Sequence, residues 1–308
     1  MTLTAEQLKE RTSYIGASDA AAVLGLSRYK TPIELWGEKT GIVPAEDISE
    51  KLPVICGNAL EDLVADLFTK KTGKKVHRVK QTIYHEKFPF IACNLDRRVV
   101  GEDALLECKT ANQFKMKEWE EGSELPQEYV VQVLHQLAVT GKAYGYLACL
   151  IGNTNFEWRR IERDDVLMDQ IIAKEVAFWN GFVEPKVMPT KVTARDGDVL
   201  HSIFGEGKEE PTVALSDEAN KLCESLEALK LDRDALEAVI AQETNTLKVM
   251  LGENSCGVTD KYRVTWREQE TARVDGKKLK AENPSVYEQF TKVSKSRVLR
   301  TAPIKAPK

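Results

Sequence analysis

Two β-prone runs separated by a tight polar turn constrain this sequence more than any other feature. The turn is the Gly-Glu-Asp tripeptide at 101–103. Apolar runs on both sides of such a turn predict a β-hairpin. Residues two apart on a strand point to the same face, so Glu107 and Lys109 should project together. Asp96, at the end of the first run, can face them from the partner strand, which gathers two carboxylates and one amine on a small patch.

This combination of groups suits metal-assisted cleavage of a phosphodiester. A bound Mg²⁺ lowers the pKa of its water and offsets the charge that develops on the phosphate. Magnesium prefers oxygen ligands and keeps several waters, so two carboxylates and a backbone carbonyl suffice. We predict Asp96, Glu107 and the carbonyl of Cys108 as metal ligands, with Mn²⁺ as a substitute ion. Lys109 would position or deprotonate the water, or steady the phosphate as a cation.

Two further candidates lie on predicted helices. Residues 58–72 have apolar side chains at helical spacing, and Glu61 on this helix could bring a carboxylate for a second metal. A long amphipathic helix at 126–140 carries Gln132, whose amide could hydrogen-bond the water or the phosphate. Each residue alone has an ordinary alternative as a surface or packing side chain, and His135, one turn from Gln132, is an open candidate. The joint order of the segments is what favours an active site.

The predicted elements indicate one large domain followed by an extension. Beyond the two helices above, strands are expected at 76–84, 90–100, 104–109, 144–151 and 157–161, and a further helix at 164–182. This order predicts an α/β domain at 1–190 with a mixed central sheet flanked by helices. Pro185, Pro189 and Pro211, with the turn residues near them, indicate an irregular connection, and we predict a linker at 191–214. Residues 215–308 form a C-terminal extension that begins with a long helix and continues as a small α+β part.

The extension begins with a heptad pattern. One heptad position is occupied by Leu215, Leu222, Leu229 and Leu236. A second is occupied by Ala219, Leu226, Ile240 and Leu247. Arg233 and Glu243 interrupt the pattern. Such a pattern is typical of one long amphipathic helix or half of a coiled coil. Residues 261–308 then hold thirteen Lys or Arg and five Asp or Glu. That basic surplus could grip a nucleic-acid backbone, or it could be an ordinary solvated face.

Composition excludes several classes of protein. The net charge of −4 and the 42% hydrophobic content argue against a polycation that coats nucleic acid, but they leave room for a local basic groove. The six cysteines form no C-x-x-C pair, which is typical of reduced thiols in a cytosolic protein. No signal-peptide-like or membrane-spanning run is present. We therefore expect a cytoplasmic protein with no membrane partner.

Several segments together resemble a known family. RTSYIGASDAAAVLG, GNALEDLVADLF, CNLDRRVV, LLECKTA and YVVQVLHQLAVTG occur in the order seen in the YqaJ-type viral recombinase group. This group lies within the lambda-exonuclease branch of the PD-(D/E)xK nuclease superfamily, and the resemblance spans about residues 11–182. It implies the PD-(D/E)xK fold and a magnesium-dependent 5′-to-3′ exonuclease that acts on double-stranded DNA. The family is named for a proline that directly precedes this aspartate, whereas in this chain Leu95 precedes Asp96.

The resemblance also implies roles for individual residues. Asp96 and Glu107 would bind metal, and Lys109 would act in the attack. Glu61 matches the family's upstream glutamate, and Gln132 matches its glutamine.

Arg11 and Ser18 match an arginine and a serine, seven residues apart, that bind a 5′-terminal phosphate. A guanidinium offers a fork of donors to phosphate, and a serine at a helix start lies where backbone N–H groups collect anions.

Related exonucleases form trimeric rings, so a homo-oligomer is expected. The 3′ strand left by resection would pass to a single-strand annealing protein during phage-type recombination. Two alternatives stay open: an endonuclease on the same fold, and a non-catalytic DNA-binding scaffold that uses the basic C-terminal region.

Overall fold

A five-stranded mixed sheet lies at the centre of the first of two units in the computed structural model of this protein. The units are Met1–Gly205 and Glu206–Lys308. The structure describes all residues except 1–9, 121, 206–211, 294–296 and 303–308. The sheet has the order β1-β4-β5-β6-β7, and only β5 and β6 run parallel. Its strands are β1 (Val76–Arg78), β4 (Arg97–Val99), β5 (Ala104–Ala111), β6 (Tyr144–Ile151) and β7 (Asn155–Glu162).

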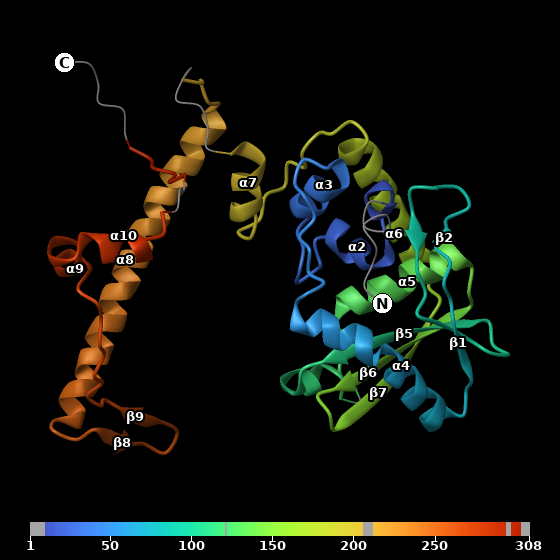
Figure 1. The fold of residues 1–308 in the computed structure, drawn as a ribbon, viewed down its shortest axis with the longest axis horizontal. Coiled ribbons are helices and arrows are strands. Elements are labelled where there is room, and N and C mark those ends of the chain that lie inside the picture. The colour runs from blue at the N-terminus through green and yellow to red at the C-terminus, as the bar shows by residue number, and fades with distance from the viewer. Residues whose placement is uncertain (1–9, 121, 206–211, 294–296, 303–308) are drawn as a thin grey trace. The chain divides into compact units, whose positions relative to one another are not determined.

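Helices cover both faces of this sheet (Figure 1). On one face, α4 (Leu52–Thr72) packs Val64 and Phe68 against a cluster that includes Leu106. The other face is covered by α5 (Gln127–Thr140), with α2 (Ala17–Val23), α3 (Pro32–Thr40) and α6 (Asp165–Phe178) packed outside it. Because successive strand residues point to opposite faces, Leu106 points to α4, whereas Glu107 points to α5.

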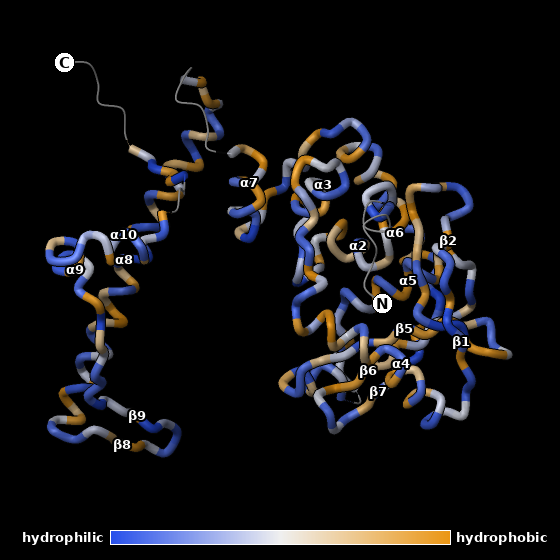
Figure 2. The backbone as a smooth tube through the Cα atoms, in the orientation of Figure 1, coloured by the Kyte–Doolittle hydropathy of each residue, from blue (hydrophilic) through white to orange (hydrophobic). Residues whose placement is uncertain are grey.

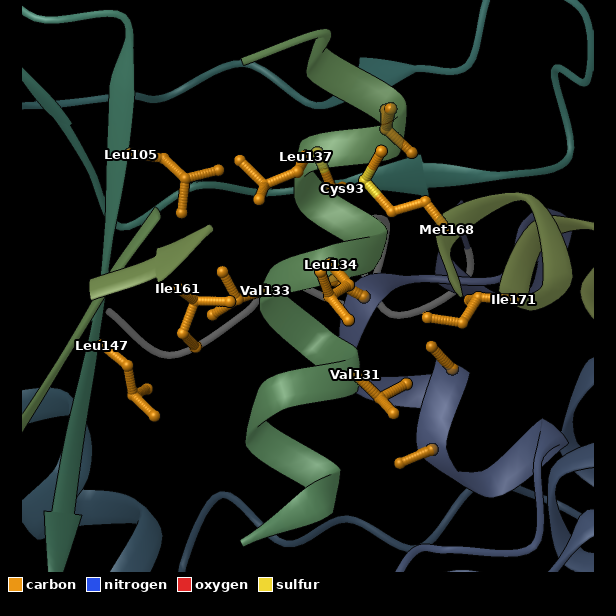
Figure 3. Packing of buried hydrophobic residues seen from close by; sticks show 14 of the residues in the cluster. Cys93, Leu105, Val131, Val133, Leu134, Leu137, Leu147, Ile161, Met168 and Ile171 are labelled. Atoms are coloured by element: carbon orange, nitrogen blue, oxygen red, sulfur yellow. The ribbon is translucent and has the colours of Figure 1, made fainter. Parts of the chain in front are cut away.

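The main core lies on both sides of α5 (Figure 3). Toward the sheet, Val133 lies near Leu147 and Ile161, and away from it Leu134 lies near Met168 of α6. A helix with apolar residues on both sides belongs in the interior, which explains why α5 is more apolar than an ordinary surface helix.

The close approach of α5 to the sheet depends on Gly145 in β6. A Cβ added at this position would lie 2.5 Å from Cγ1 of Val133 and 3.1 Å from Cδ1 of Leu105. These distances are below normal carbon–carbon contacts, so only glycine fits here without a shift of these neighbouring side chains.

Two predicted strands, 76–84 and 90–100, are each split in two. The products are β1 and β4 of the central sheet and a separate antiparallel pair, β2 (Ile83–Tyr84) and β3 (Ala92–Cys93). The second break falls at Asn94 and Asp96, and the Asp96 carboxylate accepts a hydrogen bond from the backbone of Cys108. Polar side chains that bond to nearby backbone groups compete with continued strand pairing.

Part of the segment predicted as a linker, 191–214, is helical. Helix α7 (Gly197–Phe204) contacts α3, and the unit boundary falls after it. Val199 is buried, and Ile203 packs against a cluster that contains Trp36. Residues four apart share one helix face, so these two apolar side chains hold α7 on the first unit.

The second unit is built around α8 (Asp217–Leu251), a single helix of 35 residues (Figure 1). It confirms the long helix that the heptad pattern predicted. The smaller elements after it are β8 (Cys256–Val258), β9 (Arg263–Thr265), α9 (Gly276–Glu282) and α10 (Pro284–Phe290). None of the helices that the structure describes is both long and apolar enough to cross a lipid bilayer.

Candidate active site

The predicted carboxylates and lysine lie together on β5 and beside it. Nζ of Lys109 is 2.7 Å from Oε1 of Glu107, as the two-residue spacing predicts. Asp96 lies one residue before β4, and the β4–β5 register continues to place it opposite Glu107. Its Oδ2 accepts a hydrogen bond of 2.8 Å from the N–H of Cys108. The hairpin therefore delivers all three functional groups to one pocket.

Glu61 reaches the same pocket from α4, but arginines engage it. Its Oε1 lies 2.6 Å from Arg97 and 3.2 Å from Arg78, and Asp62 pairs with the same two guanidinium groups. The side chain of Arg97 is only 4% exposed, so this buried cation needs its acidic partners. Sequence reasoning missed both arginines, because nothing local links them to α4.

Gln132 connects the two charged groups on β5. Its Nε2 donates to Oε1 of Glu107 at 2.6 Å, and its Oε1 accepts from Nζ of Lys109 at 2.9 Å. Gln136, one turn later on α5, donates from Nε2 to Oε2 of Glu107 at 2.7 Å. Sequence reasoning missed Gln136, although its spacing of four residues from Gln132 places both amides on one helix face.

The electrostatics of the pocket favour a bound cation. Burial and the negative charge of Glu107 raise the pKa of Asp96 to about 8, against the opposing influence of the Cys108 N–H and Lys109. Two carboxylates in a poorly hydrated pocket repel each other, and a divalent ion between them relieves that repulsion. Burial raises the pKa of the Cys108 thiol, so its sulfur stays protonated and only its backbone carbonyl is a candidate ligand.

Lys109 stays protonated in this setting. Burial alone would lower its pKa, but the charge and the hydrogen bond of Glu107 outweigh that effect and raise it. An ammonium group cannot accept a proton from water. Of the roles expected for Lys109, the geometry therefore favours steadying a phosphate or orienting the water over deprotonating it.

A metal would find an oxygen-rich but incomplete set of ligands. Across the described residues, no three His, Cys, Asp or Glu side chains converge as a ready-made metal cage. The donors present still fit magnesium, which takes few protein oxygens and retains several waters. Those donors are the carboxylates of Asp96 and Glu107 and the carbonyl of Cys108, while Glu61 is occupied by its arginines.

Arg11 and Ser18, the residues expected to bind a 5′-phosphate, are in contact with each other. Nη2 of Arg11 donates to Oγ of Ser18 at 3.2 Å. The backbone of Arg11 is held by Lys39, whose Nζ donates to the Arg11 carbonyl at 2.6 Å and pairs with Oδ2 of Asp19 at 2.7 Å. Both Lys39 and Asp19 are buried, so a rigid ion pair supports this end of the site.

The hollow beside Arg11 adjoins the pocket of the carboxylates. Its volume is about 460 Å³, and its lining includes Arg11, Arg78 and Lys80. It shares Glu61 and Asp96 with the first pocket. A phosphate held by these cations would therefore lie on a surface that leads to the predicted metal ligands.

His135, the open candidate on α5, is a core residue. It is fully buried, with Nδ1 2.8 Å from Oε1 of Glu175 and Nε2 2.9 Å from the carbonyl of Ala92. Burial lowers its pKa, but the Glu175 charge outweighs this and raises it. Both ring nitrogens thus face acceptors, and the residue ties α5 to α6 and β3.

Comparisons with known proteins place this chain in a family. Residues 6–143 match the YqaJ-like viral recombinase domain. The uncharacterized protein YqaJ of Bacillus subtilis (strain 168) is 38% identical over 294 residues, which cover 93% of this chain and 90% of that protein. The chain belongs to the YqaJ-like viral recombinase family. The likeness to YqaJ is too long to fit within Met1–Gly205, so it extends into the second unit of this family member.

Solved structures identify the fold of this YqaJ-family chain. The alkaline exonuclease LHK-Exo from Laribacter hongkongensis has a TM-score of 0.51 and 23% identity, covering 60% of this chain and 94% of that one. LHK-Exo in complex with dAMP gives the same TM-score at 24% identity, with the same coverage. The predicted nuclease-type α/β fold is thereby confirmed.

Proposed function

We propose that this YqaJ-family protein is a metal-dependent nuclease that degrades double-stranded DNA from its 5′ ends. The observation that supports this best is the convergence of Asp96, Glu107 and Lys109 on one pocket, with Gln132 bonded to the last two. An ion pair that served stability alone would not need a second, unpaired carboxylate beside it, since burying one has a free-energy cost.

Asp96, Glu107 and the Cys108 carbonyl would hold Mg²⁺, with Mn²⁺ as a substitute. Such an ion supplies an activated water and offsets charge on the phosphate. Lys109 would steady the scissile phosphate or orient the water, and Gln132 would keep Lys109 and Glu107 in place. In this proposal Glu61 is the carboxylate available to a second ion. Arg97 and Arg78 balance the charge of Glu61 while no second ion is bound.

Arg11 and Ser18 favour an enzyme that acts at DNA ends over an endonuclease. Their side chains are in contact beside a hollow whose other cations include Arg78 and Lys80. Internal phosphates of DNA are diesters, so a monoester phosphate such as a 5′-phosphate exists only at a strand end, and its extra charge strengthens contact with a guanidinium. Resection from that end would leave a 3′ strand for a single-strand annealing protein in the host cytoplasm. A homo-oligomer, with a trimeric ring as one form, belongs to the same proposal.

Three duplexes that share one sequence test this function: linear with 5′-phosphate, linear with 5′-hydroxyl, and closed circular. Each is incubated with the full-length protein, with and without Mg²⁺, and each strand carries its own label. We expect Mg²⁺-dependent shortening of the 5′-ended strand, fastest on the phosphorylated duplex. Cleavage of the closed circle would show an endonuclease instead, and no cleavage of any duplex with Mg²⁺ or Mn²⁺ would refute the nuclease assignment.

A further inference from the structure

One side of α8 carries an exposed apolar stripe. Its members lie at alternating spacings of three and four residues, which are the a and d positions of heptads. They range from 37% exposed at Leu226 to 76% exposed at Met250, and the others are Leu229, Leu236, Ile240 and Leu247. Figure 2 shows apolar and polar segments alternating along this helix. An extended apolar stripe of this kind on a water-exposed helix marks an interaction surface.

Two charged residues interrupt the stripe at core positions. Arg233 occupies an a position and Glu243 a d position, and both are exposed. In a parallel, in-register pair of α8 helices, Arg233 would face Arg233 and Glu243 would face Glu243. Like charges opposed at the core of a coiled coil disfavour that pairing.

An antiparallel pair reverses this outcome. There each a position of one helix lies opposite a d position of the other, so Arg233 can face Glu243 of the second copy. That single choice fixes the rest of the register, because all opposed pairs must share one midpoint, at Ala238. The remaining opposed pairs are then Leu226 with Met250, Leu229 with Leu247, and Leu236 with Ile240. Between Leu226 and Met250, every apolar member of the stripe meets another apolar member, and the two charges meet each other. Leu222, the heptad position before Leu226, lies outside this overlap.

We propose that α8 binds α8 of a second copy of this chain as an antiparallel two-helix coiled coil. The two-fold axis passes near Ala238, so each opposed pair occurs twice and the Arg233–Glu243 contact forms at two symmetric positions. The overlap from Leu226 to Met250 is about 36 Å long at ~1.5 Å per residue. This inference rests on the stripe of the second unit and not on the nuclease proposal, so either can fail without the other.

A charge-reversal cycle tests the pairing. Sedimentation equilibrium compares the full-length protein with R233E, E243R and the double variant R233E/E243R. We expect each single change to weaken association through α8 by at least about tenfold, because it opposes like charges twice, and the double change to restore it. Any association through the first unit is common to all four proteins. A double variant that associates as weakly as the singles, or singles that match the wild type, would overturn the proposal.

A matched pair of leucines separates the stripe from general surface effects. Leu236 lies on the stripe and Leu231 lies off it, and both are well exposed in the single chain. Leu236→Ala should weaken association several-fold, whereas Leu231→Ala should leave it unchanged. Equal effects of the two changes would argue against the stripe as the interface.

The orientation of the helices can be measured directly. A spin label at Glu224→Cys is introduced in a background where Cys56, Cys223 and Cys256 are serine, which leaves only buried or partly buried thiols. The antiparallel register places the two labels about 40 Å apart along the axis, whereas a parallel pair would bring them within about 20 Å. A short distance in the double electron–electron resonance trace, or no inter-label distance at protein concentrations where the mass is that of a dimer, would contradict the proposed register.

Discussion

The backbone N–H of Cys108 donates a hydrogen bond of 2.8 Å to Oδ2 of Asp96. Because Cys108 lies between Glu107 and Lys109, this one contact locks Asp96 onto the strand segment that carries the other two groups. The main chain, rather than a flexible side chain, thus sets the spacing of the two carboxylates. Preorganisation of this kind reduces the reorganisation needed when a metal and a phosphate enter.

Lys109→Ala should reduce cleavage of linear duplex by more than about 100-fold, because the ammonium group bonded to Glu107 is lost. DNA binding should persist, since Gln132 and Gln136 still hold Glu107 in place. Single-turnover cleavage and a filter-binding assay measure the two properties. The control is Lys142→Ala, which removes a lysine that pairs with Asp103 at the turn of the same hairpin. Near-normal cleavage by Lys109→Ala would remove this residue from the mechanism.

Asp96→Asn should weaken Mn²⁺ binding by about tenfold or more, because an amide lacks the charge that holds a divalent ion. Titration calorimetry with Mn²⁺ alone measures this without any turnover. Asp103→Asn serves as the control, since this aspartate is 60% exposed and pairs with Lys142. An unchanged Mn²⁺ isotherm for Asp96→Asn would mean that this carboxylate is not a ligand.

Arg11→Ala should erase the preference for a 5′-phosphorylated end, since the guanidinium fork next to Ser18 is gone. The ratio of initial rates on 5′-phosphate and 5′-hydroxyl duplexes should fall toward one, while metal binding stays the same. Arg160→Ala removes a half-exposed arginine that pairs with Glu162 on β7 and provides the comparison. If Arg11→Ala retains the full preference, the phosphate is recognised elsewhere.

Asp19→Asn should destabilise the fold by about 3–5 kcal/mol at neutral pH, because it leaves the buried charge of Lys39 without its acidic partner. Burial opposes ionisation of Asp19, but Lys39, Lys30 and Arg11 lower its pKa to about 2. A lowered pKa means that the stabilisation is complete above the unfolded value of 3.8 and disappears as pH falls toward 2. Urea unfolding should therefore show a smaller difference between wild type and variant at pH 3 than at pH 7.

A matched change at an exposed acid on α6, Asp169→Asn, should alter the free energy of unfolding little at either pH. A difference between wild type and Asp19→Asn that is the same at pH 3 and pH 7 would contradict the ion-pair explanation.

The parts of the site that sequence predicted are those that depend on local geometry. Glu107 and Lys109 share a face because they are two residues apart on one strand, and Gln132 reaches them from a helix whose period is visible in the sequence. The position of Asp96 opposite Glu107 could be predicted because a short turn joins β4 to β5.

The parts that sequence missed depend on packing between distant elements. Arg97 and Arg78 engage Glu61 only because β1 and β4 run beside α4, and no pattern along the chain indicates that neighbourhood. The split of the two predicted strands has a similar origin, since β2 and β3 pair with each other outside the central sheet. Propensity describes one segment, whereas these features are settled by which segment lies next to it.

Gly145 shows that the geometry of an active site can depend on a residue that has no side chain. Because Gly145 has no side chain, α5 can pack closely against β6. The same helix carries Gln132 and Gln136, which hydrogen-bond to Glu107. The methyl group of an alanine would lie 2.5 Å from Cγ1 of Val133, so this neighbour of Gln132 on α5 would have to shift. The packing of the helix that carries both glutamines, and through Gln132 the hydrogen bond to Lys109, therefore depends on the missing side chain at Gly145.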